Sequence, residues 1–130
     1  MRLFLVRHAE AAPGEPDELR PLTLAGRKTA RALGARLAKQ GLKPDAVLSS
    51  PLLRARETAA ELGRALGCAP EADERLAPGA TAADLRDAVA GRGEAVVVVG
   101  HQPDCGLIVA EIAGGSPPKF PPGGMAALEL

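Results

Sequence analysis

Three short apolar runs predict buried β-strands. The first covers Leu3 to Val6, the second Asp45 to Ser49, and the third Ala95 to Val99. The third run, AVVVV, has no polar position at all, which is typical of a strand in the middle of a sheet that helices cover on both faces. We expect Met125 to Leu130 to return as a last strand.

Between these runs, apolar residues recur every three or four positions, which predicts amphipathic helices. Four helices are expected: Leu24 to Gln40 with Thr23 as its cap, Ser50 to Gly67, Thr81 to about Ala90, and Pro103 to Gly114. In the second of these, Ser50 followed by proline is a cap and first-turn signal. Strands that alternate with helices predict an α/β fold, a three-layer sandwich with a largely parallel central sheet flanked by helices.

The chain has 130 residues, and we expect residues 1–130 to form a single domain. Sixteen basic and 16 acidic residues cancel, which argues against a dedicated binder of nucleic acid or of membrane surfaces. The opening apolar run is too short for a signal peptide or a membrane span, so we expect a cytoplasmic protein. Cys68 and Cys105 are too few and too isolated for a disulfide framework or a zinc site, and we expect neither metal nor cofactor.

Polar residues follow three of the predicted strands. Arg7 and His8 come directly after the first strand, Arg54 lies beyond the end of the second, and His101 follows the central one. In an open parallel sheet the carboxyl ends of the strands form one crevice where ligands bind, so these side chains are expected to meet there. Two guanidiniums, two imidazoles and the N-termini of the helices that follow the second and the central strand predict an anion site.

This set of side chains suits phosphoryl transfer. Guanidinium forks match phosphoryl oxygens and keep their charge at neutral pH. A neutral imidazole whose far nitrogen donates to a backbone carbonyl presents its other nitrogen as a nucleophile, and a second imidazole can donate a hydrogen bond to the transferring group. Either histidine by itself would more often be structural, so the prediction depends on their convergence.

Four segments, FLVRHAE, RPLTLAG, SSPLLRARETA and VVVVGHQP, occur in this order along almost the whole chain. Together they resemble the motifs of the histidine phosphatase superfamily, in its small SixA-type branch, and this resemblance implies a phosphoglycerate mutase-like fold. It also implies that His8 is the nucleophile that becomes phosphorylated. By the same resemblance Arg7, Arg54 and His101 hold the phosphoryl group. Arg56 lies about 200° around a helix from Arg54 and is expected to point elsewhere.

Arg20, in RPLTLAG, and Glu10 are further candidates for substrate binding. Each has a simpler alternative. Arg20 can pair with an acid and pin the loop above the site, and Glu10 can pair with an arginine.

The resemblance implies a phosphatase that removes phosphoryl groups from histidine-phosphorylated signalling or phosphocarrier proteins through a phospho-His8 intermediate. An alkoxide leaving group needs a general acid, whereas the imidazole of phosphohistidine leaves easily, and no acid is obvious in this short chain. Glu10, Glu74 and Asp104 stay open as candidates. The alternatives are a phosphatase of small phosphorylated metabolites and, in a different class, a phosphate-binding module without turnover. The expected partner is therefore a phosphorylated protein or a small phosphorylated metabolite.

Overall fold

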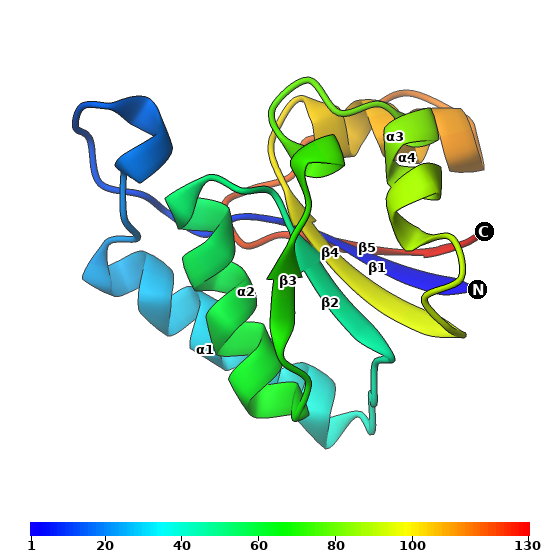
Figure 1. The fold of residues 1–130 in the computed structure, drawn as a ribbon, viewed down its shortest axis with the longest axis horizontal. Helices are drawn as coiled ribbons and strands as arrows, with labels where there is room; N and C mark the ends of the chain where they lie inside the picture. The colour runs from blue at the N-terminus through cyan, green and yellow to red at the C-terminus, as the bar shows by residue number, and fades with distance from the viewer.

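A computed structural model describes all 130 residues and shows one sheet between two layers of helices (Figure 1). The strands are β1 Arg2–Arg7, β2 Ala46–Ser49, β3 Pro70–Ala72, β4 Ala95–Gly100 and β5 Met125–Glu129. The helices are α1 Leu24–Lys39, α2 Leu53–Leu66, α3 Ala82–Val89 and α4 Asp104–Ala113, with short 3-10 turns at Asp17–Leu19 and Glu74–Leu76. The predicted α/β sandwich is confirmed.

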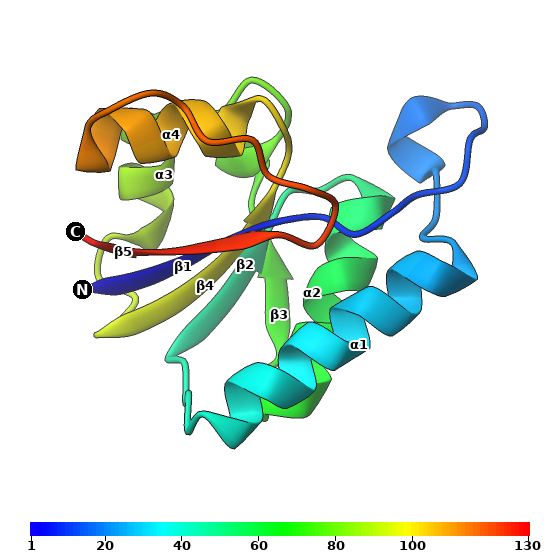
Figure 2. The same ribbon diagram turned by 180° about the vertical axis from the view of Figure 1, so that it is seen from behind.

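Helices α1 and α2 cover one face of the sheet and α3 and α4 the other (Figure 2). Each face carries its own core. Successive side chains of a strand point to opposite faces. In β4, Val97 and Val99 pack with α1 and α2, whereas Val96 and Val98 pack with α3 and α4. All four valines are at most 1% exposed, which explains why this strand is apolar at every position.

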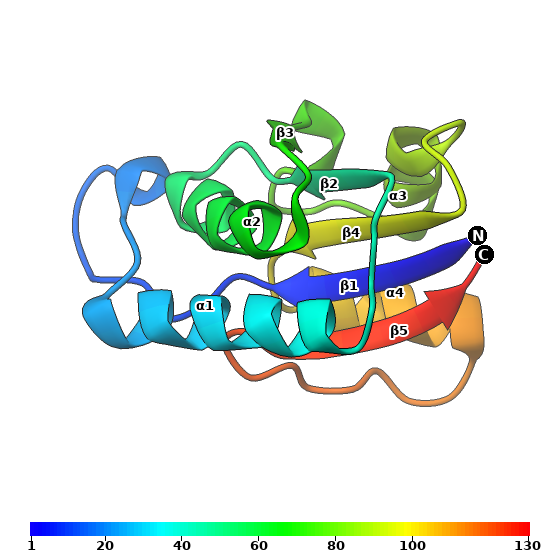
Figure 3. The same cartoon turned by 90° about the horizontal axis from the view of Figure 1, so that it is seen from below.

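The strand order is β3-β2-β4-β1-β5, with β4 in the middle (Figure 3). Neighbouring strands run parallel except β5, which is antiparallel to β1, so the prediction of a largely parallel sheet is confirmed. The edge strand β3 was not predicted. Its three residues, PEA, are all exposed and begin with proline, so they carry neither an apolar run nor an alternating pattern.

Helix ends agree with the predicted caps at most positions. The Thr23 hydroxyl accepts a hydrogen bond from the backbone of Gly26, and Thr81 forms a reciprocal capping box with Asp84. Gly67 ends α2 with a φ of 67°, a left-handed conformation that glycine adopts without strain. No helix is long and apolar enough to cross a bilayer.

The prediction that Ser50 caps α2 was wrong. The helix begins at Leu53, and the preceding Leu52 makes no side-chain cap. The backbone N–H of Ser50 instead donates to Val99 in the sheet, and its hydroxyl contacts His101. These bonds hold Ser50 in line with β2, so the chain turns into the helix only after it. Helix α4 starts at Asp104, one residue after the predicted start at Pro103, which occupies the N-cap position.

Candidate active site

Backbone hydrogen bonds at the ends of the three central strands bring the predicted site residues together. The N–H of His8 donates to the carbonyl of Gly100 over 2.9 Å, directly before His101. The N–H of Ser50 donates to Val99 over 3.0 Å, which aligns the end of β2 with the same edge. As a result the ring centroids of His8 and His101 lie 5.2 Å apart. The predicted meeting of the two imidazoles is confirmed.

The His8 ring has one nitrogen committed to the backbone. Its Nδ1 lies 2.7 Å from the carbonyl oxygen of Ala9. A carbonyl only accepts hydrogen bonds, so Nδ1 carries the proton and Nε2 keeps its lone pair. Burial lowers the pKa of His8 below 6.5, against the opposing effect of the Ala9 hydrogen bond, and the charge of Arg54 lowers this pKa further. The ring is therefore neutral at neutral pH.

This pKa shift gives a direct prediction for titration. Because the neutral form is favoured in the folded protein, we expect the His8 ring to protonate only as the pH falls below 6.5. The chain contains two histidines, so proton NMR of the unsubstituted protein and of His101→Ala assigns the His8 resonance. A midpoint at or above 6.5 would contradict this prediction.

His101 is buried, with 5% of its surface exposed. Its Nε2 lies 2.7 Å from the hydroxyl oxygen of Ser50, which is completely buried. Burial, and next the neighbouring His8, lower the pKa of His101 to about 4. Both imidazoles are thus neutral under ordinary conditions, and neither supplies a fixed positive charge to the site.

Two arginines converge on the carboxylate of Asp17. Arg54, which is 7% exposed, donates from Nη1 to the backbone carbonyl of Asp17 over 2.9 Å and from Nη2 to its carboxylate over 3.1 Å. Arg20 donates from Nη1 to the other carboxylate oxygen over 3.0 Å. Hydrogen bonds from Arg20 and Arg54 lower the pKa of Asp17. These guanidiniums are therefore arranged to bind an oxyanion, and in this structure Asp17 supplies one.

The Arg7 side chain is anchored on the side of β1 that faces β5. Its Nη1 donates to the carbonyl of Phe120, in the segment before β5, over 2.8 Å. Its Nε is buried and has no hydrogen-bond partner within the protein. A buried N–H without a partner is costly, so this Nε is an unsatisfied donor next to the strand-end cluster.

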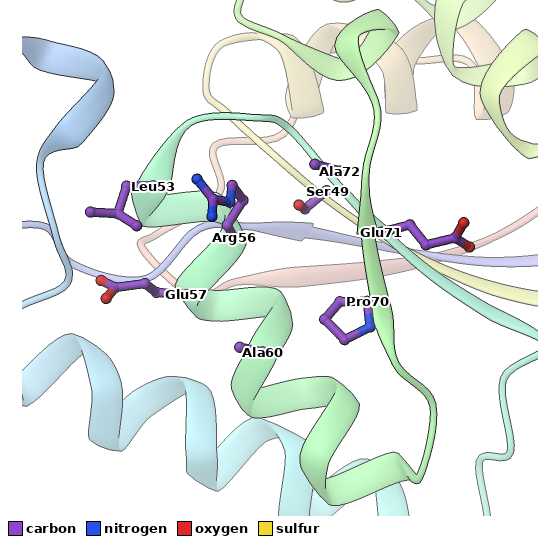
Figure 4. Close-up of a pocket in the computed structure, with 8 residues that line it drawn as sticks. All are labelled: Ser49, Leu53, Arg56, Glu57, Ala60, Pro70, Glu71 and Ala72. Atoms are coloured by element: carbon purple, nitrogen blue, oxygen red, sulfur yellow. The ribbon is translucent and has the colours of Figure 1, made fainter.

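Arg56 points away from these residues, as predicted. It is exposed and lies with Glu57 and Glu71 in a groove of about 330 Å³ between α2 and β3 (Figure 4). Arg54, two residues earlier, is buried. The first turn of α2 therefore separates the two arginines onto different faces.

The remaining sequence candidates have partners of their own. The Glu10 carboxylate accepts from the Thr23 hydroxyl over 2.7 Å, at the start of α1. Arg20 pins the loop, as the alternative prediction had it, because it donates to Ala12 as well as to Asp17. Direct contact of Glu10 or Arg20 with a substrate stays a prediction.

Two residues of the site were missed by sequence reasoning. Asp17 lies in an acidic, proline-rich loop where no pattern distinguishes it from Glu15 or Glu18. The SSP motif predicts a helix cap at Ser50, but the Ser50 hydroxyl contacts His101. The order of the motifs places Ser50 at a strand end beside a histidine, and that signal was available.

Known proteins are similar to this chain in sequence and in fold. The model of the histidine phosphatase superfamily (branch 1) matches residues 3–78. Phosphohistidine phosphatase SixA of Escherichia coli K12 is 35% identical over all of this chain and 86% of its own length. The structure of the protein histidine phosphatase SixA complexed with tungstate superimposes with a TM-score of 0.90 at 33% identity, over 100% of this chain and 88% of that one.

A second solved structure is similar over almost the same extent. The putative SixA of Agrobacterium tumefaciens has a TM-score of 0.83 at 30% identity, over 97% of this chain and 89% of that one. The fold is therefore phosphoglycerate mutase-like, as the resemblance implied. The family-model match and the relatives that align along the whole chain lead to one conclusion: this chain belongs to the histidine phosphatase superfamily.

Proposed function

We propose that this protein is a phosphohistidine phosphatase that uses His8 as its nucleophile. The observation that carries the proposal is the state of the His8 ring. Its Nδ1–H is held by the Ala9 carbonyl, its Nε2 is unprotonated, and His101 lies beside it at the edge where Arg54 is buried. A neutral, oriented imidazole in a cluster of anion-binding groups is the arrangement that nucleophilic attack on phosphorus requires.

The reaction has two steps. The Nε2 lone pair of His8 attacks phosphorus, and the bond between phosphorus and the imidazole nitrogen of the substrate breaks. That nitrogen keeps the bonding electron pair and takes a proton from water, and the hydroxide left behind is neutralised by the proton that is released in the second step. A water molecule then attacks phospho-His8, releases inorganic phosphate and returns His8 to its neutral form. Transfer between two imidazoles is nearly balanced in energy, so the first step does not need a strong acid.

The other three residues act on the phosphoryl oxygens. Arg7 and Arg54 supply guanidinium N–H groups to the phosphoryl oxygens. Arg54 would exchange its bond with the Asp17 carboxylate for one with the phosphoryl group. His101 is the further donor. Charge that builds up on these oxygens in the transition state is stabilised by donors already in place.

The carboxyl groups near the site support phosphohistidine over a phosphomonoester as substrate. A monoester releases an alkoxide, which needs a protonated acid beside it. Asp17 is the carboxyl that reaches the arginines, and its lowered pKa keeps it ionised at neutral pH. Glu10 is bonded to Thr23, and Asp104 accepts from the backbone of Gly79. The similar proteins named phosphohistidine phosphatases support the same choice.

The surface next to Arg7 supports a protein as the carrier of the phosphohistidine. A groove of about 580 Å³ begins at Arg7 and runs between the start of α4 and the segment before β5. Its lining includes the exposed residues Pro103, Leu107, Pro117, Pro118 and Lys119. Leu107 is 55% exposed. An exposed apolar patch continuous with a reacting centre is suited to the apolar surface around a modified side chain of another protein.

The proposal is tested by comparing rates on a histidine-phosphorylated carrier protein, on free phosphohistidine and on a panel of phosphomonoesters. We expect the highest kcat/KM on the carrier. Higher values on a monoester would replace the substrate assignment with a small phosphorylated metabolite. Binding of phosphate without turnover of any of these compounds would replace the enzyme with a phosphate-binding module.

A substitution at Leu107 distinguishes recognition of the carrier protein from the phosphoryl-transfer reaction itself. We expect Leu107→Asp to lower kcat/KM on the carrier protein by about tenfold, because apolar contact at the groove is lost, and to leave turnover of free phosphohistidine unchanged. Leu24→Asp is the matched control, since Leu24 is also strongly exposed, at 72%, but lies at the start of α1. Equal effects of the two variants on the carrier would exclude the groove as the contact surface.

A further inference from the structure

The hydroxyl of Ser50 has two hydrogen-bond contacts and no others. Its oxygen accepts from the N–H of Leu52 over 3.2 Å and lies 2.7 Å from Nε2 of His101. Ser50 is 0% exposed, so water does not reach this hydroxyl from the surface. The direction of the bond between Ser50 and His101 decides which nitrogen of the imidazole carries the proton.

The contacts settle that direction. The Leu52 N–H is a donor, so it leaves the hydroxyl hydrogen of Ser50 free to be donated elsewhere. If Nε2 of His101 were also a donor, this hydrogen would be buried without an acceptor, which native structures avoid. The hydroxyl therefore donates to Nε2. A neutral imidazole has one N–H, so the proton of His101 must be on Nδ1.

We infer that Ser50 is a positioning residue for the phosphoryl transfer, and that it acts by fixing His101 in the tautomer with the proton on Nδ1. The inference rests on the proposed function, in which His101 donates a hydrogen bond to the transferring group. Nδ1 is the ring nitrogen that has no partner within the protein, so in this tautomer the free nitrogen is a donor. In the opposite tautomer the free nitrogen would carry a lone pair directed at a negatively charged group.

The two histidines therefore share one tautomer, with the proton on Nδ1, but have opposite roles in the reaction. His8 has its Nδ1–H bound to the Ala9 carbonyl and keeps the unprotonated Nε2 free. His101 has its Nε2 bound to the Ser50 hydroxyl and keeps the protonated Nδ1 free. A backbone acceptor prepares one ring as a nucleophile, and a side-chain donor prepares the other as a hydrogen-bond donor. Neutrality of both rings makes these assignments matter, because a doubly protonated imidazole has no tautomer to select.

The tautomer is measured directly by NMR of the protein labelled with nitrogen-15 in its histidines, at neutral pH. In the unsubstituted protein we expect His101 to show a protonated Nδ1 and an unprotonated, hydrogen-bonded Nε2. In Ser50→Ala we expect the proton to move at least partly to Nε2. A His101 ring already protonated on Nε2 in the unsubstituted protein would overturn the inference. This measurement needs no substrate, so it stands even if the proposed activity fails.

Kinetics then tests whether the tautomer matters for the reaction. We expect Ser50→Ala to lower kcat on the order of 10²-fold, near the loss of one donor to a developing negative charge, with a smaller change in KM. Ser49→Ala is the matched control, because Ser49 is a neighbouring buried serine whose hydroxyl donates to the Ser50 carbonyl and does not reach His101. In a His101→Ala background, Ser50→Ala is expected to cause no further loss. An equal loss in that background would show that Ser50 acts by another route.

Discussion

Replacement of His8 by alanine is expected to lower kcat by about 10⁵- to 10⁶-fold, the size of loss seen when an enzyme loses its nucleophile. Alanine has no nitrogen to accept the phosphoryl group. The neighbouring His101 cannot take over, because its Nε2 is bound to Ser50 and its free Nδ1 carries the ring proton. Both turnover and the acid-labile phosphoenzyme should disappear. The measurement is steady-state turnover together with trapping of radiolabelled phosphate on denatured protein.

The matched comparison for this experiment is His101→Ala. If His101 acts as a donor to the phosphoryl group, its loss slows the reaction but leaves His8 able to become phosphorylated, so the trapped phosphoenzyme persists. Phosphoenzyme that survives in His8→Ala and vanishes in His101→Ala would reverse the roles of the two histidines. Circular dichroism of both variants controls for loss of fold.

The parts of the site that could be predicted from the sequence are those set by the sheet. His8 and His101 each stand directly after a strand with a clear apolar pattern, and parallel pairing of β1 with β4 then makes their approach unavoidable. The placement of Arg54 could also be predicted, from the helix after β2. Arg54 and Arg56 are two positions apart and so lie on different faces of this helix, and Arg54 is on the buried face.

The parts that could not be predicted are contacts made by irregular segments. Asp17 reaches Arg54 across 37 positions from a 3-10 turn, and no periodicity describes where such a turn folds. The carbonyl of Phe120 that holds Arg7 is a backbone group, which any residue type would supply. Ser50 shows a different limit. A serine before proline can begin a helix or extend a strand, and here the hydrogen bond from its backbone N–H to Val99 keeps it in line with β2, where its hydroxyl contacts His101.

Replacement of Arg54 by alanine is expected to weaken transition-state binding by about 3 to 4 kcal/mol, seen as a 10²- to 10³-fold lower kcat/KM. The guanidinium is almost fully buried and already holds an oxyanion, the Asp17 carboxylate, so its charge and its N–H groups act on the phosphoryl group once that carboxylate is exchanged for it. Arg54→Lys keeps the charge but loses the planar fork, and we expect an intermediate loss.

Arg56→Ala supplies the matched control for this prediction. Arg56 is on the same turn of α2 and has the same charge, but it is exposed in the groove beside β3, so its removal should change kcat/KM by about twofold or less. The difference in kcat/KM between Arg54→Ala and Arg56→Ala therefore measures the effect of the arginine's position and not of the protein's net charge. Comparable losses in both would mean that a general electrostatic attraction, and not the strand-end cluster, binds the phosphoryl group. An unchanged rate in Arg54→Ala would remove Arg54 from the site.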